Sequence, residues 1–453
     1  MTELQAVLNS LRVRVGLALR KDLQDRVLQD SAVVLGGNLL SLGLGVISSA
    51  VLARSLGPEG LSTFAIVGAA TSIAGTVSDL GLRLGAIRHI AAALVNSAQE
   101  AYALARAYAR LKLVGSVVTA LLLVVLAQPL SNYLHLPGDA GPALLRIGAV
   151  AMLATALSSL VGTLLHALAK FRHLILAQSA NVILTVLLMS ALWLGGRLDV
   201  STALLVGALT AVVAGILSLA LLPASWRRAI RLPLRSLPAL RGTESRSLLS
   251  FSRWMWASNI LSMLSVQVDV LLLNFFLPLP MVGIYALARN LAQKAGAVNQ
   301  TLHTVLAPGV SALVEADERR VYVRQSLIRS CLLAALVALA APLARPFILL
   351  FYGGAFAASI NVFYALLLVI LFDLLVSPLV LLALPLNRPG VLALSDGAQV
   401  VVLLLVGVIA VPHLDIYGIV VARLAARIAG ALVALPPLLR SLRATQWGGT
   451  DAS

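Results

Sequence analysis

The sequence predicts an all-α membrane protein of twelve transmembrane helices, arranged as two six-helix lobes around a central cavity. Of its 453 residues, 60% are hydrophobic and 11% are charged, whereas about a quarter of the residues of a soluble domain are charged. Twelve apolar stretches are long enough to cross a bilayer, which takes about 20 residues per helix. Lys and Arg residues concentrate in every second connection between these stretches. These patterns favour lipid as the solvent for most of the chain.

The predicted helices follow one another along the chain with short connections. The stretches do not alternate apolar and polar residues with period two, which argues against the strands of a membrane barrel. The predicted spans are residues 31–54, 60–82, 113–134, 143–168, 171–195, 201–223, 250–276, 281–306, 327–350, 358–384, 389–411 and 415–438.

Basic residues predict the orientation of the chain. The net charge is +16, and a basic excess in a membrane protein marks its cytoplasmic loops rather than a nucleic-acid site. One predicted side carries few basic residues, namely Arg54, Arg146, Arg197 and Arg345. The N-terminus, the alternate loops and the C-terminus carry most of the others. Both termini are therefore predicted to be cytoplasmic, and no nucleic-acid partner is expected.

The segments outside the spans are predicted to lie at the cytoplasmic face. Residues 3–30 are charged throughout and suit an amphipathic helix on the membrane surface, and residues 98–112 suggest a second surface helix. A stretch rich in Arg, Pro and Ser near the midpoint reads as a linker between two halves. The predicted divisions are an N-terminal segment 1–30, an N-lobe 31–223, a linker 224–249, a C-lobe 250–438 and a tail 439–453.

A weak internal repeat supports the two halves. With the chain shifted by 221 residues, "NLLSLGLGV" at Asn38 faces "NILSMLSVQ" at Asn259. An even number of helices in each repeat would give both halves the same orientation, related by an axis along the membrane normal. Such pairs enclose a cavity that opens to alternate sides, which is the plan of a transporter; a channel or a scaffold remains an alternative at this point.

Several segments together resemble a known family. These are "LARSLGPEGLSTFAI" (52–66), "SDLGLRLGAIRHIAA" (78–92), "LHALAKFRHLILAQ" (165–178), "VGIYALARNLAQKAGAVNQTLHTVLAPGVSAL" (282–313) and "LLFYGGAFAAS" (349–359). In order and spacing they resemble the bacterial polysaccharide and O-antigen flippases. Those flippases belong to the multidrug/oligosaccharidyl-lipid/polysaccharide (MOP) exporter superfamily, which includes the MATE transporters.

The resemblance implies a function. It implies a flippase of the bacterial inner membrane that moves an isoprenoid pyrophosphate-linked oligosaccharide by alternating access, for O-antigen, capsule or exopolysaccharide synthesis. An ion gradient would drive it, without a cofactor. Membrane lipid, a glycan polymerase and glycosyltransferases would be its partners.

Four cations fall inside predicted membrane helices and are the candidate substrate ligands. They are Arg289 and Lys294 in span 281–306, and Arg423 and Arg427 in span 415–438. A cation at the centre of a membrane helix costs about 2.5–3.5 kcal/mol on insertion scales. Guanidinium groups suit diphosphate because they donate two hydrogen bonds to its oxygens. The four are therefore predicted to line a cationic cavity.

Three membrane acids offer the competing explanation. Asp269, Asp373 and Asp396 could pair with the cations and hold the helices together. We expect a mixture, in which acids neutralise the cations in the empty state and phosphate replaces them on loading. Asp269 is expected to be the exchanging partner, because its depth is close to that of Arg289, and any of the three acids could couple transport to an ion.

Other polar side chains complete the prediction. Asn38, Asn259, Gln293 and Gln300 are expected to add polar groups to the cavity. Asp79 and Arg83, four residues apart, are expected to form a local ion pair. The histidines are scattered, so no metal site is expected.

Two alternative functions fit the sequence less well. A drug or small-cation exporter of the same superfamily would carry cationic cargo, which a basic cavity disfavours. A membrane glycan polymerase or ligase would need a large outer loop for catalysis, whereas the predicted outer turns are short. The absence of a P-loop pattern excludes nucleotide hydrolysis by the chain itself. A transporter rather than an enzyme is therefore expected.

Overall fold

The computed structural model is a bundle of long helices. It describes residues 2–230, 243–311, 316–380 and 389–444, with side-chain surroundings for 33–228, 256, 259–296, 324–376 and 394–436. The α-helices are α1 (Thr2–Asp79), α2 (Leu82–Asn96), α3 (Ala98–Val125), α4 (Ala127–Tyr133), α5 (Ala140–Ala167), α6 (Phe171–Leu194), α7 (Val200–Leu221), α8 (Ala224–Ile230), α9 (Thr243–Phe276), α10 (Leu279–Ser311), α11 (Ala316–Ala340), α12 (Ala344–Tyr352), α13 (Ser359–Val380), α14 (Pro389–Leu414) and α15 (Ile416–Ala444).

Two of the predicted spans are joined within α1. The chain bends sharply at Gly57, whose φ of 64° and ψ of −175° lie outside the helical region. Glycine reaches this conformation without the steric cost that a Cβ atom would bring. Pro58 follows and cannot donate a backbone hydrogen bond, which helps to end the first helical part. The predicted break between residues 54 and 60 is therefore confirmed as a bend.

Within the described residues, ten helices are long and apolar enough to cross a membrane. The stretch Val33–Asn96, which contains the bend at Gly57, counts once among them, and α10 does not count. Helix α10 is 33 residues long but carries Arg289, Asn290, Gln293 and Lys294 close together, which lowers its hydropathy. The predicted membrane protein of helices is confirmed, while the number twelve stays a prediction.

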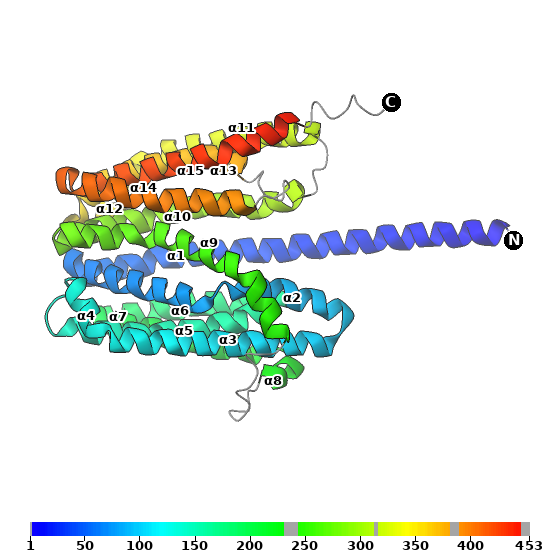
Figure 1. Ribbon diagram of the computed structural model, residues 1–453, viewed down its shortest axis with the longest axis horizontal. Coiled ribbons are helices and arrows are strands. Elements are labelled where there is room, and N and C mark those ends of the chain that lie inside the picture. Colours follow the sequence, from blue (N-terminus) through cyan, green and yellow to red (C-terminus); the bar gives the residue numbers. More distant parts are fainter. Residues whose placement is uncertain (1, 231–242, 312–315, 381–388, 445–453) are drawn as a thin grey trace.

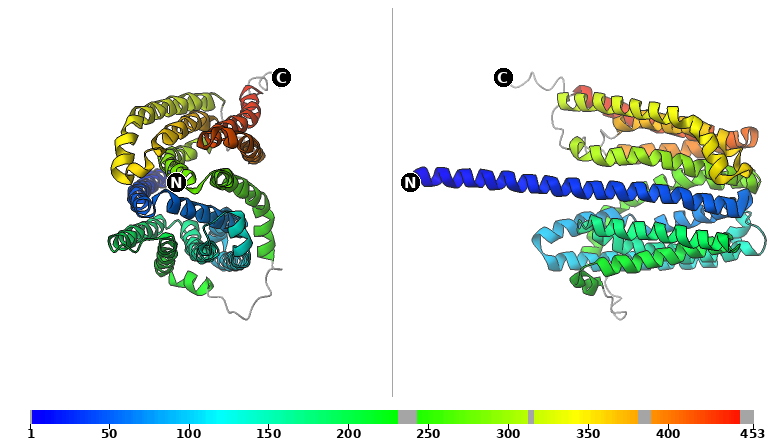
Figure 2. Two further views of the ribbon diagram at one scale, coloured as in Figure 1. Left: turned by 90° about the vertical axis from the view of Figure 1, so that its left-hand side faces the viewer. Right: turned by 180° about the vertical axis from the view of Figure 1, so that it is seen from behind.

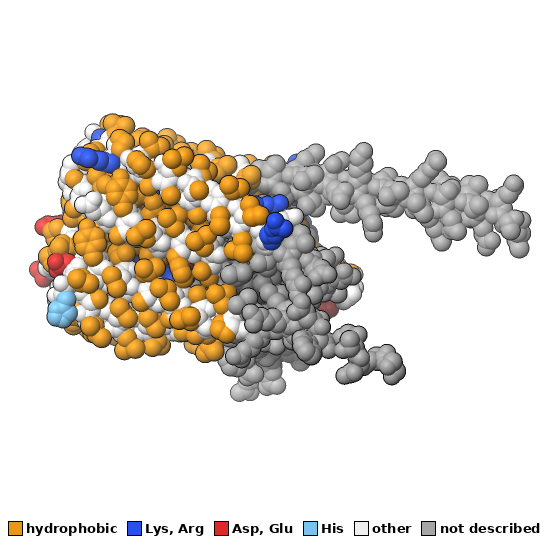
Figure 3. All heavy atoms as spheres, turned by 90° about the horizontal axis from the view of Figure 1, so that it is seen from above, with side chains coloured by type: hydrophobic (Ala, Val, Ile, Leu, Met, Phe, Trp, Pro, Cys, Tyr) orange, Lys and Arg blue, Asp and Glu red, His pale blue; other side chains and the backbone are white. Residues whose placement is uncertain are grey.

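The helices form two groups with a shared middle. Figure 1 shows α2 to α8 on one side and α10 to α15 on the other, with α1 and α9 running between them. The end-on view in Figure 2 separates the cyan-to-green helices from the yellow-to-red ones. The surface between the two ends is mostly apolar (Figure 3), with charged side chains gathered mainly toward the ends. Such a wide apolar surface fits a lipid environment.

The two groups pack against each other at the end where α1 bends. A buried cluster there joins Ala50, Ala53 and Leu61 of α1 to Leu287 of α10 and Tyr352 of α12. A second cluster joins the later part of α1 to α9, α10, α14 and α15. A third cluster, built from α2, α3, α5 and the start of α8, stays within one group. Apolar packing therefore closes the molecule at the Gly57 end.

Polar contacts reinforce this closed end. Arg54 donates hydrogen bonds from Nε to the carbonyl oxygen of Phe351 at 2.9 Å and from Nη2 to that of Leu350 at 2.5 Å. These carbonyls belong to the last turn of α12, where the helix dipole favours a cation. The hydroxyls of Ser49 and Tyr352 lie 2.8 Å apart. The contacts tie α1 to α12 across the two groups.

The segment predicted as a second surface helix is different in the structure. Residues 98–112 are the first part of the continuous helix α3, which begins after Ser97, whose side chain accepts a hydrogen bond from the Glu100 backbone. Tyr108 and Lys112 are buried, and the Tyr108 hydroxyl donates to Thr163 at 3.1 Å. The prediction of a surface helix is wrong because one face of this segment packs into the helix group.

Candidate functional site

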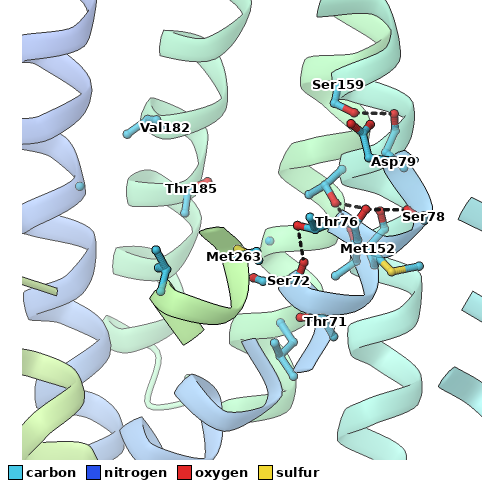
Figure 4. A pocket seen from close by; sticks show the side chains of 18 of the residues that line it. Thr71, Ser72, Thr76, Ser78, Asp79, Met152, Ser159, Val182, Thr185 and Met263 are labelled. Carbon is cyan, nitrogen blue, oxygen red and sulfur yellow. Dashed lines mark hydrogen bonds between the residues drawn. The ribbon is translucent and has the colours of Figure 1, made fainter. Parts of the chain in front are cut away.

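A cavity of about 1070 Å³ lies between the two helix groups. Its walls come from α1, α2, α3, α5, α6 and α7, and from α9 and α10 on the other side. Most of its polar lining is uncharged: serine, threonine and asparagine side chains alternate with small apolar ones. Figure 4 shows labelled hydroxyl side chains such as Thr71, Thr76 and Thr185 around one hollow. A polar cavity of this size inside an apolar bundle is a candidate substrate site.

Lys294 lines this cavity as predicted. Its ammonium Nζ donates to Asn290 Oδ1, 2.6 Å away and one turn earlier on α10. An added Cβ at Gly45 of α1 would lie 3.8 Å from Nζ, so the lysine head reaches from α10 to α1. Asn259 of α9 also lines the cavity. An ammonium group hydrogen-bonded to a neutral amide keeps its charge available for an anion.

Arg289 and Arg423 lie elsewhere, against Asp269. Asp269 Oδ1 accepts from Arg289 Nη1 at 2.9 Å, and Oδ2 is 2.7 Å from Arg423 Nη2. The Tyr285 hydroxyl and the Val270 backbone N–H also donate to this carboxylate. Asp269 is fully buried, while the two arginine side chains are 13% and 14% exposed. The carboxylate thus joins α9, α10 and α15 in one hydrogen-bonded cluster.

Arg427 forms a second, more open pair. Its Nε lies 3.2 Å from Asp373 Oδ2 on α13, and both side chains are about one-third exposed. Arg427 Nη1 also donates to Gln399 Oε1 at 2.8 Å. The predicted pairing of membrane cations with acids is therefore present for three of the four cations. Of the four, Lys294 alone is among the residues that line the cavity.

The remaining predicted residues take varied positions. Asn38 and Gln293 are exposed, Asp396 of α14 is partly buried, and none of these three lies among the residues that line the cavity. The side chain of Gln300 lies outside the described part of the chain. The structure places Asn259 and Lys294 on the cavity lining, and Asn38, Gln293 and Asp396 are not among the lining residues.

The structure adds a charged cluster that the sequence pattern missed. Asp79, Arg83, Lys112 and His166 line the cavity toward the end of the molecule opposite Gly57. The carboxylate of Asp79 pairs with Lys112 rather than with Arg83, so the predicted i, i+4 pair is wrong. Lys112 belongs to α3, 33 residues away in the sequence. The cluster was missed because Lys112 was assigned to a surface segment.

No group of three or more His, Cys, Asp and Glu side chains that could hold a metal ion lies within the described residues. The prediction that the protein works without a cofactor stays a prediction.

Two helix groups around a polar central cavity are the architecture of a class of membrane transporters. Comparison with solved structures agrees. An inward-facing multidrug resistance MATE family transporter of the MOP superfamily matches with a TM-score of 0.72 at 13% identity, over 93% of this chain and 100% of that one. The lipid II flippase MurJ, in an inward closed conformation, matches with a TM-score of 0.71 at 13% identity, over 90% and 87%.

The family is established by sequence. The model of the family described as polysaccharide biosynthesis protein matches residues 27–314, so the chain belongs to that family. An outward-facing MATE family transporter of the MOP superfamily matches with a TM-score of 0.55 at 14% identity, over 92% of this chain and 95% of that one. Comparison with curated protein sequences gives no match. The matches to solved structures show that the fold is that of the MOP superfamily, as the sequence resemblance implied.

Proposed function

We propose that the protein is a flippase that moves an isoprenoid pyrophosphate-linked oligosaccharide across the bacterial inner membrane. Membership of the polysaccharide biosynthesis family supports a glycan precursor as the cargo. The observation that carries the proposal is the cavity of about 1070 Å³ between the helix groups, with Lys294 on its wall. The diphosphate and sugars would cross through this cavity while the isoprenoid tail stays in lipid. O-antigen, capsule or exopolysaccharide synthesis would use the product.

The proposed mechanism is alternating access with the Gly57 end facing outward. The positive-inside distribution of Lys and Arg supports cytoplasmic termini. Packing closes the Gly57 end, and the better match to the inward-facing transporter than to the outward-facing one supports an inward-open state. In the same proposal an ion gradient drives the cycle. Glycosyltransferases act before the flippase, and a glycan polymerase acts after it.

Lys294 is the proposed ligand of the diphosphate in the cavity. Its ammonium group donates to the neutral side chain of Asn290, and no carboxylate is paired with it in the described part of the chain; the amide of Asn259 lines the same cavity. Arg289, Arg423 and Arg427 meet carboxylates instead. In the same proposal, phosphate displaces these carboxylates when the cargo is loaded.

Replacing Lys294 should abolish most transport. Lys294→Met keeps the length of the side chain and removes one charge-assisted contact worth about 1.5–3 kcal/mol, so the flipping rate should fall roughly 10- to 100-fold. The measurement is the initial rate of flipping in proteoliposomes with a defined polyprenyl pyrophosphate-linked glycan. Lys170→Met, outside the cavity in the connection between α5 and α6, is the matched control and should flip normally. A normal rate in Lys294→Met at equal protein level would remove the case for this site.

A further inference from the structure

One wall of the cavity is made of hydroxyl groups. We define the hydroxyl wall as the cavity-lining side chains of α1, α5 and α6 that donate to a carbonyl of their own helix, and its members used here are Thr71, Thr76, Ser78, Thr155, Ser159 and Thr185. All of them except Thr155 are labelled in Figure 4. They come from the N-terminal half of the chain and line the same cavity as Lys294 of α10.

Each of these hydroxyls donates its hydrogen atom to a backbone carbonyl of its own helix. Thr71 donates to the carbonyl of Val67 at 2.9 Å, and Thr155 donates to that of Met152 at 2.8 Å. The same pattern, donation to a carbonyl three or four residues earlier, holds for the other members, namely Thr76 (3.1 Å), Ser78 (2.7 Å), Ser159 (2.9 Å) and Thr185 (2.8 Å). A hydroxyl that donates its proton still has lone pairs to accept with. The wall therefore offers acceptors to the cavity.

An acceptor surface selects its ligand. Phosphate oxygens only accept hydrogen bonds, so they gain nothing from oxygens whose protons point into the protein. Sugar hydroxyls and acetamido N–H groups are donors and match the wall. Asp79, which also lines the cavity and is paired with Lys112, adds carboxylate oxygens of the same acceptor type.

The opposite wall has the complementary chemistry. Lys294 supplies N–H donors, one of which meets Asn290 Oδ1, and Asn259 and Asn290 line the cavity from α9 and α10. Lys294 and the two amides thus lie on α9 and α10 and the wall of hydroxyl acceptors on α1, α5 and α6, while Arg83 and Lys112 of α2 and α3 also line the cavity, toward the end opposite Gly57. The hydroxyl wall therefore lies on other helices than Lys294, the proposed ligand of the diphosphate.

The geometry points to the hydroxyl wall as the glycan-binding surface, which takes neutral hydroxyl- and acetamido-bearing sugars as hydrogen-bond donors. This inference rests on the proposed function. It sets the orientation of the cargo, with the diphosphate on Lys294 and the first sugars against α1 and α5. If these hydroxyls only bonded to carbonyls of their own helix, the affinity for the sugars would not depend on them.

The test compares two lipids on three forms of the protein. The probes are a polyprenyl pyrophosphate and the same lipid carrying N,N′-diacetylchitobiose, titrated onto protein in phosphatidylcholine nanodiscs. The forms are the wild type, Thr71→Val/Thr76→Val/Thr155→Val, and the matching triple Thr→Ser variant. Val removes the hydroxyl and keeps the branched shape, while Ser keeps the hydroxyl. Thr119→Val on α3, outside the residues that line the cavity, is the control.

We expect the wild type to bind the glycosylated lipid more tightly than the bare one. The triple Val variant should lose about 10-fold or more in affinity for the glycosylated lipid, from the loss of two or three neutral hydrogen bonds. Its affinity for the bare lipid should not change, and the triple Ser variant should retain wild-type binding.

Two results would overturn the inference. Equal wild-type affinity for both lipids would show that the sugars make no contact, whether or not the Val variant folds. Unchanged binding of the glycosylated lipid by the folded Val variant would exclude the hydroxyls as the contact. Both results leave the proposed function standing. Failure of the wild type to bind either lipid would instead overturn the proposed function.

Discussion

Asp269→Asn should be the most destabilising single substitution at the charged sites. Asp269 is fully buried and pairs with both Arg289 and Arg423. The amide keeps the shape but removes the negative charge, and it leaves two guanidinium groups beside a neutral partner. Breaking a buried ion pair from one side costs about 3–5 kcal/mol. Thermal unfolding of the purified protein in detergent should show a clear fall in midpoint, together with a lower yield.

Asp373→Asn is the matched control for this prediction. It makes the same chemical change to an acid that also pairs with an arginine, but Asp373 and Arg427 are each about one-third exposed. Exposed pairs contribute about 0–1 kcal/mol, so its midpoint should stay close to that of the wild type. If the two variants unfold at the same temperature, the buried cluster does not stabilise the junction of α9, α10 and α15.

Gly283→Ala should have the second large effect, through packing rather than charge. A Cβ atom at Gly283 would lie 1.9 Å from the backbone oxygen of Pro58 and 2.7 Å from its carbonyl carbon. The obstacle is backbone, so the two helices must separate. Overpacking of a tight contact costs about 1–3 kcal/mol. Because this contact lies at the closed end, the substitution should also disfavour the state that is closed there.

The separation can be measured directly. Spin labels at Glu59 and Ala357, in a Cys331→Ser background, should show a longer or broader distance in Gly283→Ala than in its parent. Gly296→Ala is the control on the same helix, because an added Cβ at Gly296 meets no atom within 4 Å and alanine favours the helix. An unchanged distance and midpoint in Gly283→Ala would mean that Pro58 and Gly283 do not limit closure.

The partners of the charged residues could be predicted from the sequence only in part. Arg289 and Asp269 could be matched because both lie at similar depth in neighbouring predicted helices, and their ion pair is confirmed. Lys294 was grouped with the arginines because all four cations look alike in a hydropathy pattern. The structure separates them: α10 turns Arg289 toward Asp269 and Lys294 toward Gly45. The rotation of a helix about its axis depends on its neighbours, which a single sequence does not specify.

The partners of Asp79 illustrate the same limit. Its nearest basic residue on a continuous helix would be Arg83, but the helix breaks after Asp79, and Leu80 and Gly81 adopt positive φ angles of 49° and 65°. This turn removes the i, i+4 geometry on which the predicted pair depended. Lys112 takes that place from α3. A local spacing rule fails wherever the helix it assumes is interrupted.

The sequence by itself determined that the chain is a bundle of helices in lipid, and it carried the family resemblance. It could do so because apolar length and helical period are local properties, and each backbone polar group in lipid must be satisfied within its own helix. The tertiary structure alone decided which cations meet carboxylates, which one reaches the cavity, and that a wall of hydroxyl oxygens faces it. Those outcomes depend on how helices far apart in the chain rotate and pack against each other. A buried charge or hydroxyl must find a hydrogen-bond partner, and packing decides which neighbour is close enough.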